Sequence, residues 1–107
     1  MTDPLVERLR AQVGGVRDGA LLRFSIGNAL LSDGQYAEAA HAFREALVFD
    51  PNYSAAWKLL GKALLAVDDE DGAARAWSEG VATATARGDI QASKEMTVFL
   101  NRLKRQG

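Results

Sequence analysis

Residues 26–47 read IGNALLSDGQYAEAAHAFREAL, and residues 60–81 read LGKALLAVDDEDGAARAWSEGV. The two stretches repeat each other at an offset of 34 residues, the difference between positions 60 and 26. The matches at this offset are Ile26-Gly27 with Leu60-Gly61, Leu30 with Leu64, Ala39 with Ala73, Phe43 with Trp77, and Leu47 with Val81. Such agreement in so short a chain indicates two copies of one structural unit. A period in this range is typical of solenoids, in which each unit stacks on the next.

The composition predicts one helical domain without a metal or cofactor. A chain of 107 residues corresponds to a single domain, which can bury one modest core without disulfide or metal cross-links. Alanine, the best helix former, makes up much of the 48% apolar content and permits close approach of helices. The chain has no cysteine, which excludes disulfides, thiol nucleophiles and cysteine zinc sites.

Charge and targeting signals predict a cytoplasmic protein with neither nucleic-acid nor membrane partners. The net charge is −1, so no overall field draws the chain to phosphates or anionic lipid. The first residues, Met1-Thr2-Asp3-Pro4, do not read as a signal peptide, and no apolar run is long enough for a membrane span. The lack of cysteine suits a reducing compartment, although a periplasmic location stays open.

Start and stop signals in the first half predict three helices. The first follows the cap Asp3-Pro4, carries Leu5, Leu9 and Val13 at four-residue spacing, and ends at Gly14-Gly15. The second spans about 18–32 with Asp18 as its cap, and Asp33-Gly34 forms the next turn. The third spans about 35–49 and is ended by Pro51, because the residue before proline avoids the helical conformation.

Three further helices are expected in the second half. The fourth spans about 53–66, with Asn52 as its cap. The fifth begins in the acidic turn at 68–71 and runs to Arg87, because no proline interrupts it before Gly88-Asp89. The sixth spans about 89–104, and its apolar residues are Met96, Phe99, Leu100 and Leu103. Polar residues fill most of the rest, as a solvent-facing end of a solenoid requires.

Residues 20–53 and 54–87 resemble two tetratricopeptide repeats. The first copy supplies the motif residues Ile26, Gly27, Leu30, Ala39, Phe43, Ala46 and Pro51, with Arg23 in place of an aromatic. The second supplies Trp57, Leu60, Gly61, Leu64, Ala73, Trp77 and Gly80, and departs from the pattern at Thr85. The resemblance implies an all-α solenoid of helix–turn–helix units. It would comprise about six helices in one domain over 1–107: an N-terminal helix and loop (1–17), two repeats (20–53 and 54–87) and a capping helix (89–105).

The resemblance also implies a binding groove. In the family, the first helix of each repeat lines a concave face, which predicts peptide-binding roles for Leu21, Phe24, Asn28, Leu31, Lys58, Lys62 and Leu65. Lys58 and Lys62 are four residues apart and repel each other, so an anionic ligand would turn this repulsion into attraction. The groove would then take an acidic or C-terminal peptide. The alternative is that both lysines are solvated and only keep the groove soluble.

Other motifs do not support catalysis. His41 is the only histidine, and no nucleophile or orienting partner can be assigned to it. The acidic residues 68–71 fail as a calcium loop, because Val67 and Ser78 stand where carboxylates are required.

The sequence therefore predicts a non-catalytic module that binds another protein or a peptide and is either a monomer or a weak homo-oligomer. Two alternatives stay open: a structural protein that assembles with itself, and an assembly or regulatory subunit of an enzyme that uses the convex face.

Overall fold

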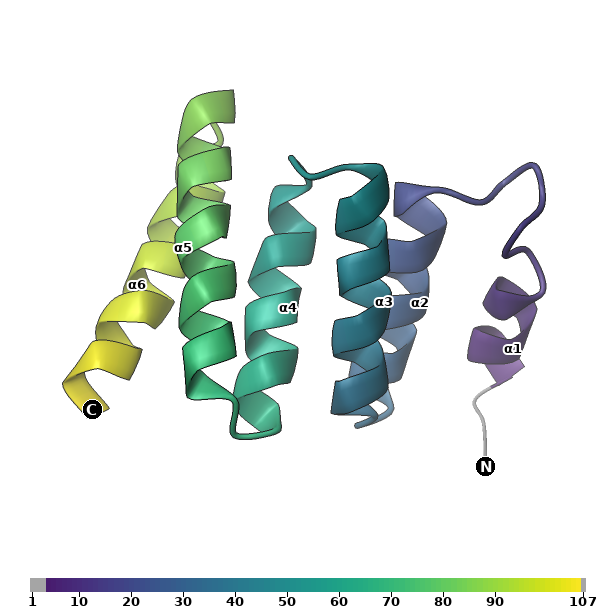
Figure 1. Cartoon of the computed structure of the whole chain (residues 1–107), viewed down its shortest axis with the longest axis horizontal. Helices are drawn as coiled ribbons and strands as arrows, with labels where there is room; N and C mark the ends of the chain where they lie inside the picture. The colour runs from purple at the N-terminus through teal and green to yellow at the C-terminus, as the bar shows by residue number, and fades with distance from the viewer. Residues whose placement is uncertain (1–3, 107) are drawn as a thin grey trace.

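The computed structural model describes residues 4–106, which form six α-helices and no strand. The helices are α1 Pro4–Arg10, α2 Ala20–Ser32, α3 Tyr36–Phe49, α4 Ser54–Ala66, α5 Glu70–Arg87 and α6 Ile90–Gln106 (Figure 1). The expected all-α architecture of six helices is therefore confirmed. The expected cap at Asp3 lies outside the described residues.

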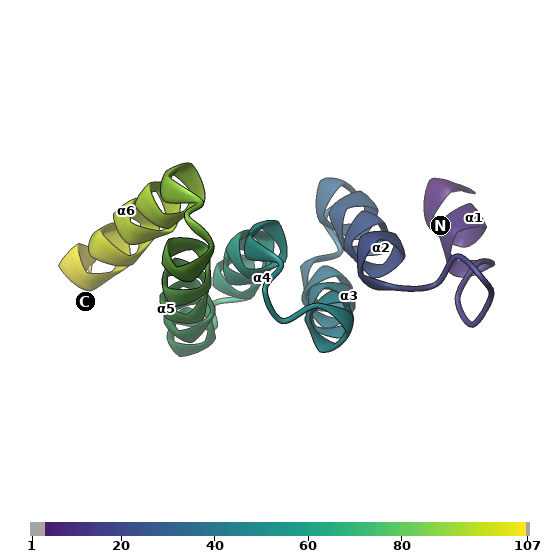
Figure 2. The same ribbon diagram turned by 90° about the horizontal axis from the view of Figure 1, so that it is seen from above.

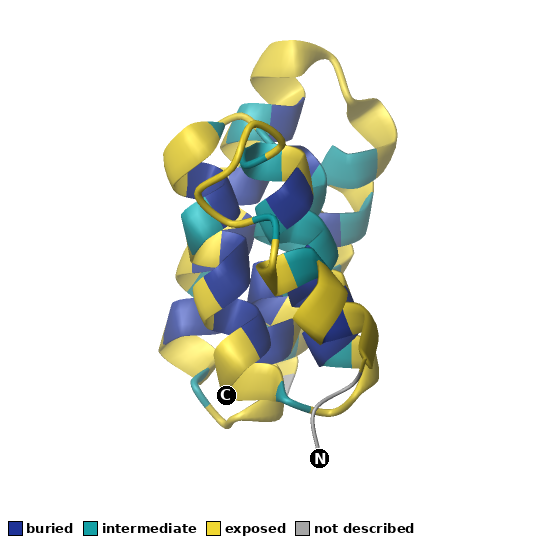
Figure 3. Cartoon of the chain, turned by 90° about the vertical axis from the view of Figure 1, so that its right-hand side faces the viewer, coloured by how far each residue is buried: buried dark blue, intermediate teal, exposed yellow. Residues whose placement is uncertain are grey.

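The helices are arranged in two layers. Successive helices run antiparallel, and α2, α4 and α6 lie on one side of the stack while α3 and α5 lie on the other (Figure 2). The Cα atoms extend over 40 × 30 × 18 Å, so the molecule is elongated along the stack and two helices thick. Buried residues gather between the layers, and the outer helix faces are exposed (Figure 3). This is the open row of helix hairpins that a solenoid requires.

A glycine facing an aromatic ring joins the two helices of each repeat. A Cβ atom on Gly27 would lie 2.6 Å from Cε1 of Phe43, and one on Gly61 would lie 2.1 Å from Nε1 of Trp77. Both rings are almost completely buried. The indole N–H of Trp77 also donates a hydrogen bond to the carbonyl of Lys58 at 3.1 Å. The matches of Gly27 with Gly61 and of Phe43 with Trp77 thus mark a close contact between the two helices of each repeat.

The C-terminal end continues the same packing with a different pair. A Cβ atom on Gly80 would lie 2.3 Å from Sδ of Met96, which is fully buried. The ring of Phe99 packs against Trp77 with 5.2 Å between ring centroids. Gly88 ends α5 with a φ of 77°, a left-handed conformation that glycine adopts without strain. The structure therefore places α6 where the capping helix was expected.

The N-terminal helix differs from the expectation. It ends at Arg10 instead of continuing to Gly14-Gly15, because the chain tightens into i→i−3 hydrogen bonds from Gln12 to Leu9 and from Val13 to Arg10. Val6 is fully buried, while Leu5 and Val13 are 43% and 42% exposed. Within residues 4–106 the backbone of this short helix packs against α2, and Val6 is its buried residue. The four-residue spacing of Leu5, Leu9 and Val13 therefore does not mark a buried stripe.

Two expected helix caps were also wrong. The Asp18 carboxylate accepts backbone N–H groups of Gly14 and Gly19, both at 2.9 Å, so it holds the preceding loop and does not cap α2. Asn52 does not cap α4 either, since that helix begins at Ser54 after an N-cap residue without a side-chain bond. In contrast, Asp69 caps α5 by accepting the N–H of Gly72 at 2.9 Å.

Candidate binding groove

The residues predicted to line the groove come from α2 and α4, and α6 continues their layer. Each of the seven is at least partly accessible: Leu21, Asn28, Lys62 and Leu65 are exposed, while Phe24, Leu31 and Lys58 are half-buried. They belong to one layer of helices, and α6 lies beside α4 in it (Figure 2). The surface that could receive a ligand therefore involves three helices, of which the repeat pattern indicates two.

At the α2 end, Phe24 forms an aromatic wall. Its ring lies 5.6 Å from the ring of Phe43 and stacks on Tyr53 at 4.8 Å, measured between centroids. Burial raises the pKa of the Tyr53 hydroxyl above its usual value. Because Tyr53 directly precedes α4, this stack joins the two repeats. Phe24 is thus held by two ring contacts while part of it remains accessible.

Leu21 lies apart from the other predicted residues. It lines a cavity of about 410 Å³ together with Leu9, Gln12 and Arg17, on the side of α2 that faces α1. The side chain is 70% exposed. Leu21 therefore belongs to the N-terminal edge of the layer.

The two lysines have different environments. The ammonium of Lys58 lies 3.1 Å from the Glu95 carboxylate, which makes an ion pair between α4 and α6. The ammonium of Lys62 lies over the ring of Phe99, 5.1 Å from its centroid, a cation–π contact that leaves its charge without a carboxylate within 4 Å among the described residues. The repeat pattern offers no signal for either partner, because α6 does not follow the repeat register.

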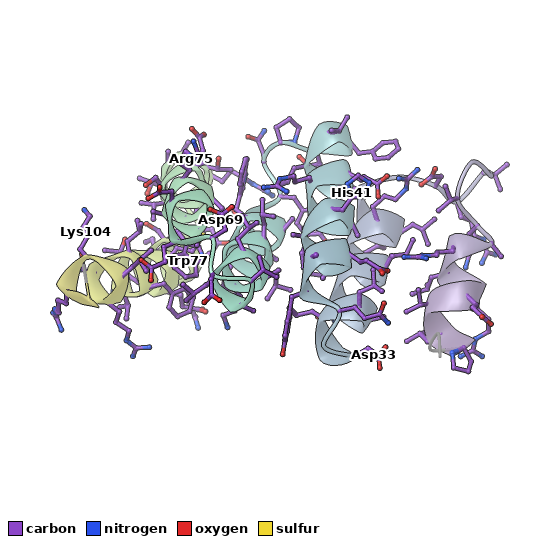
Figure 4. The ribbon with its side chains drawn as sticks, turned by 60° about the horizontal axis from the view of Figure 1, so that its bottom comes forward. Asp33, His41, Asp69, Arg75, Trp77 and Lys104 are labelled. Carbon is purple, nitrogen blue, oxygen red and sulfur yellow. The ribbon has the colours of Figure 1, made fainter. Side chains whose placement is uncertain are left out.

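A cleft opens between α4 and α6 next to Lys62. Its volume is about 340 Å³, and its lining residues are Lys62, Leu65, Trp77, Phe99, Arg102 and Leu103. Figure 4 places Trp77 where α4, α5 and α6 meet, so the indole forms the floor. The cleft combines an apolar floor with two cationic side chains, Lys62 and Arg102. Among the predicted residues, the structure brings only Lys62 and Leu65 together here.

Other chemical candidates are not assembled into a site. His41, labelled on α3 in Figure 4, is largely exposed and has Glu45 at 3.8 Å as its carboxylate neighbour. Within residues 4–106, no cluster of three or more acidic or histidine side chains could hold a metal ion. None of the helices in the same range has both the length and the apolar character to cross a membrane.

Comparisons with known proteins agree with this geometry. The family model of the TPR repeat matches residues 27–68. A TPR repeat-containing protein of Pseudomonas aeruginosa is 48% identical over 101 residues, which cover 94% of this chain and 96% of that protein. A Bordetella parapertussis protein with a known solution structure is 45% identical, with a TM-score of 0.83 over 98% of this chain and 91% of its own.

A more distant structure shows the same fold. The crystal structure of PcrH from Pseudomonas aeruginosa superimposes with a TM-score of 0.84 at 18% identity, over 92% of this chain and 76% of that one. Proteins with this repeat generally mediate protein–protein interaction and are typically non-catalytic scaffolds. The helix-pair packing, the family match and the full-length relative together show that this chain belongs to the tetratricopeptide-repeat family.

Proposed function

We propose that this protein is a non-catalytic module that binds a peptide or protein segment in the groove formed by α2, α4 and α6. The proposal keeps the seven predicted residues as peptide-binding residues, with Leu21 at the N-terminal edge of the layer and the other six along the groove: Leu21, Phe24, Asn28, Leu31, Lys58, Lys62 and Leu65. The observation that carries it is the cleft between α4 and α6, where exposed apolar surface and two cations lie together. Recognition sites commonly pair an apolar pocket with a few polar groups that orient the ligand.

The two lysines of the groove have different roles, because only one of them forms an ion pair with a described residue. Lys58 already has a carboxylate partner in Glu95, so its charge mainly holds α6 against α4. Lys62 and Arg102 stand at the cleft, and neither forms an ion pair with a described residue. A ligand carboxylate would therefore be recognised by Lys62 and Arg102. This is the acidic preference expected from the sequence, displaced by one helical turn toward the C-terminal end of α4.

The apolar part of the ligand would enter the same cleft. Leu65, Phe99 and Leu103 line it and remain partly accessible. A volume of about 340 Å³ accommodates one large side chain and its neighbours, such as leucine, phenylalanine or tryptophan. The favoured ligand is thus a segment that carries a large apolar residue close to Asp, Glu or a C-terminal carboxylate.

A peptide selection tests this proposal. Random peptides displayed on phage are selected on the wild-type protein, and the affinities of synthetic winners are then measured for variants. We expect a large apolar residue beside an acidic one in the selected peptides. Lys62→Glu combined with Arg102→Glu should weaken their binding about fourfold or more, because two attractive contacts of about 0.2–1 kcal/mol each become repulsive.

A matched control separates specific recognition from overall charge. Arg44→Glu combined with Arg75→Glu makes the same change in net charge on α3 and α5, in the other layer. This control should change affinity by less than about twofold, the scale of a screened distant charge. Equal losses in both variants, or selected peptides without acidic residues, would contradict the proposed recognition.

A further inference from the structure

A larger cavity lies at the N-terminal end of the stack, between α1, α2 and α3. It measures about 710 Å³, more than twice the volume of the cleft between α4 and α6. Its apolar lining consists of Val13, Ile26, Leu30, Ala37 and Ala42, from the segment after α1 and from α2 and α3. None of the seven groove residues lines it.

The cavity exists because α1 is too short to cover its neighbour. A helix of 7 residues is about 10 Å long, whereas the 13 residues of α2 extend for about 20 Å. Inside the stack, α3 is flanked by the full-length helices α2 and α4 (Figure 1). At the N-terminal end, part of the face that α2 and α3 present lacks such a neighbour, and this uncovered part forms the cavity.

The rim of the cavity carries both signs of charge in equal number. Arg10 lies 3.2 Å from Glu38 across the mouth, and both side chains are about half exposed. Arg23 lies 2.6 Å from Glu45, and His41 stands beside that carboxylate. A strongly acidic or strongly basic partner would be repelled by half of this rim. A surface with alternating signs instead complements itself after a two-fold rotation.

An exposed apolar segment adjoins the cavity. Val13 is at its edge, and Val16, three residues later, is fully exposed in the loop between α1 and α2. This surface is also self-complementary, because the exposed apolar segment of each copy can fill the apolar cavity of the other. The net charge of −1 imposes little repulsion between two copies.

We propose that this N-terminal face binds a second copy of the chain in an isologous dimer. The face is defined by Arg10, Val13, Val16, Glu38 and His41. With the two-fold axis between Arg10 and Glu38, the Arg10 guanidinium of one copy meets the Glu38 carboxylate of the other, and the pair within each chain is exchanged for two pairs between chains. The groove on α2, α4 and α6 stays open in this arrangement, so the dimer would present two grooves.

Sedimentation equilibrium with charge-reversed variants tests the pairing. At concentrations up to about 1 mM, where even weak specific association is populated, the mass of the wild type should rise from 11.5 kDa toward twice that value. Arg10→Glu and Glu38→Arg should each raise the dissociation constant about tenfold or more, because each homodimer then has two like-charged contacts. An equimolar mixture of the two variants should form a heterodimer, which native mass spectrometry identifies by its mass.

The mixing step isolates the contact between chains. In the mixture, the pair within each chain is still like-charged, whereas both pairs across the interface are attractive. Exposed ion pairs contribute little to folding, so each variant should retain the wild-type circular dichroism spectrum. Val16→Asp gives an independent check, since a fully exposed loop residue can be changed without unfolding the chain, and it should also abolish the dimer.

The outcomes separate this interface from the groove. Lys62→Glu with Arg102→Glu should leave the dissociation constant of the dimer unchanged while it weakens peptide binding. A wild type that remains at 11.5 kDa throughout overturns the proposal and leaves the cavity to another protein. A dimer that survives all three N-terminal substitutions, or variants that do not pair on mixing, also overturns it.

Discussion

Replacing Gly61 by alanine probes the contact on which the second repeat depends. In an exposed helix this substitution stabilises, because alanine has a higher helix propensity than glycine by about 1 kcal/mol. Here the new Cβ would lie 2.1 Å from Nε1 and 2.4 Å from Cε2 of Trp77. Ordinary carbon contacts are about 3.5–4.0 Å, so the indole must retreat by roughly 1 Å or more.

The structure indicates how much that retreat costs. Trp77 is only 2% exposed, and its N–H donates to the carbonyl of Lys58 at 3.1 Å. Displacement breaks this bond and leaves a buried donor without a partner, at a cost of about 1–3 kcal/mol. Overpacking adds about 1–3 kcal/mol. After the gain in helix propensity is subtracted, Gly61→Ala should destabilise the protein by about 1–5 kcal/mol. Gly61→Leu should leave the chain unfolded.

Urea denaturation followed by circular dichroism measures this effect. With a slope of about 1–3 kcal/mol per molar urea, a loss of 1 kcal/mol or more lowers the midpoint by about 0.3 M or more. The Trp77→Phe background provides a matched control, because its smaller ring makes no such hydrogen bond. The loss of stability caused by Gly61→Ala should be smaller in this background. The double-mutant cycle then gives the interaction free energy between positions 61 and 77. A Gly61→Ala protein as stable as the wild type, or more stable, would refute the assigned packing.

Three further substitutions test other contacts, and urea midpoints measure each of them. Lys58→Glu should destabilise by placing two carboxylates together between α4 and α6, and adding Glu95→Lys should restore the midpoint; no recovery would exclude the pair. Ser54→Ala should stabilise by up to about 1 kcal/mol, because the Ser54 hydroxyl is buried without a described partner; a clear loss would reveal a hidden one. Hydrogen bonds from Arg23 and from backbone N–H groups hold the pKa of Asp18 well below its usual value of about 3.9. The ionised carboxylate therefore stabilises the folded state above about pH 3.9, and this stabilisation fades as the pH falls further. Asp18→Asn should therefore be less stable than the wild type at pH 6, and the difference between their urea midpoints should narrow below pH 4. A difference that does not change with pH would contradict this linkage.

Much of the fold followed from short-range patterns. The spacing of small and large residues within 26–47 and 60–81 reports how two helices pack, and each helix pair lies close together in the chain. The end of α5 at Gly88 is likewise a local signal, because glycine readily adopts the left-handed conformation found there. The acidic turn at 68–71, expected to start the fifth helix, is of the same kind, and Asp69 in it caps α5. The partition of the chain into 1–17, 20–53, 54–87 and 89–105 stays a prediction.

The errors occurred where local signals compete with distant contacts. Asp18 is a good cap by type, but in the structure its carboxylate is bound by Arg23 and by the backbone of the preceding loop. In the first helix, Leu5, Val6 and Leu9 are all apolar, and only the position of α2 determines that Val6 is buried. In such cases propensity indicates which residues could cap a helix or face the core, and tertiary packing determines which of them do.

The candidate site shows the same division. The motif positions place Lys58, Lys62 and Leu65 on the accessible side of α4, because a helical period decides which residues share a face. The partners of these residues, Glu95 and Phe99, come from α6, which lies outside the repeats and has its own register. No period in the chain relates α6 to α4, so nothing local could show that one lysine is neutralised and the other stands at a cleft.

Sequence thus determined the helical architecture and the repeat contacts, since these depend on periodicity and side-chain size over neighbouring segments. Tertiary structure determined which charges are satisfied, where the cleft opens and which face at the N-terminal end remains uncovered. Those properties depend on distances between residues far apart in the chain, and such distances exist only once the helices have packed.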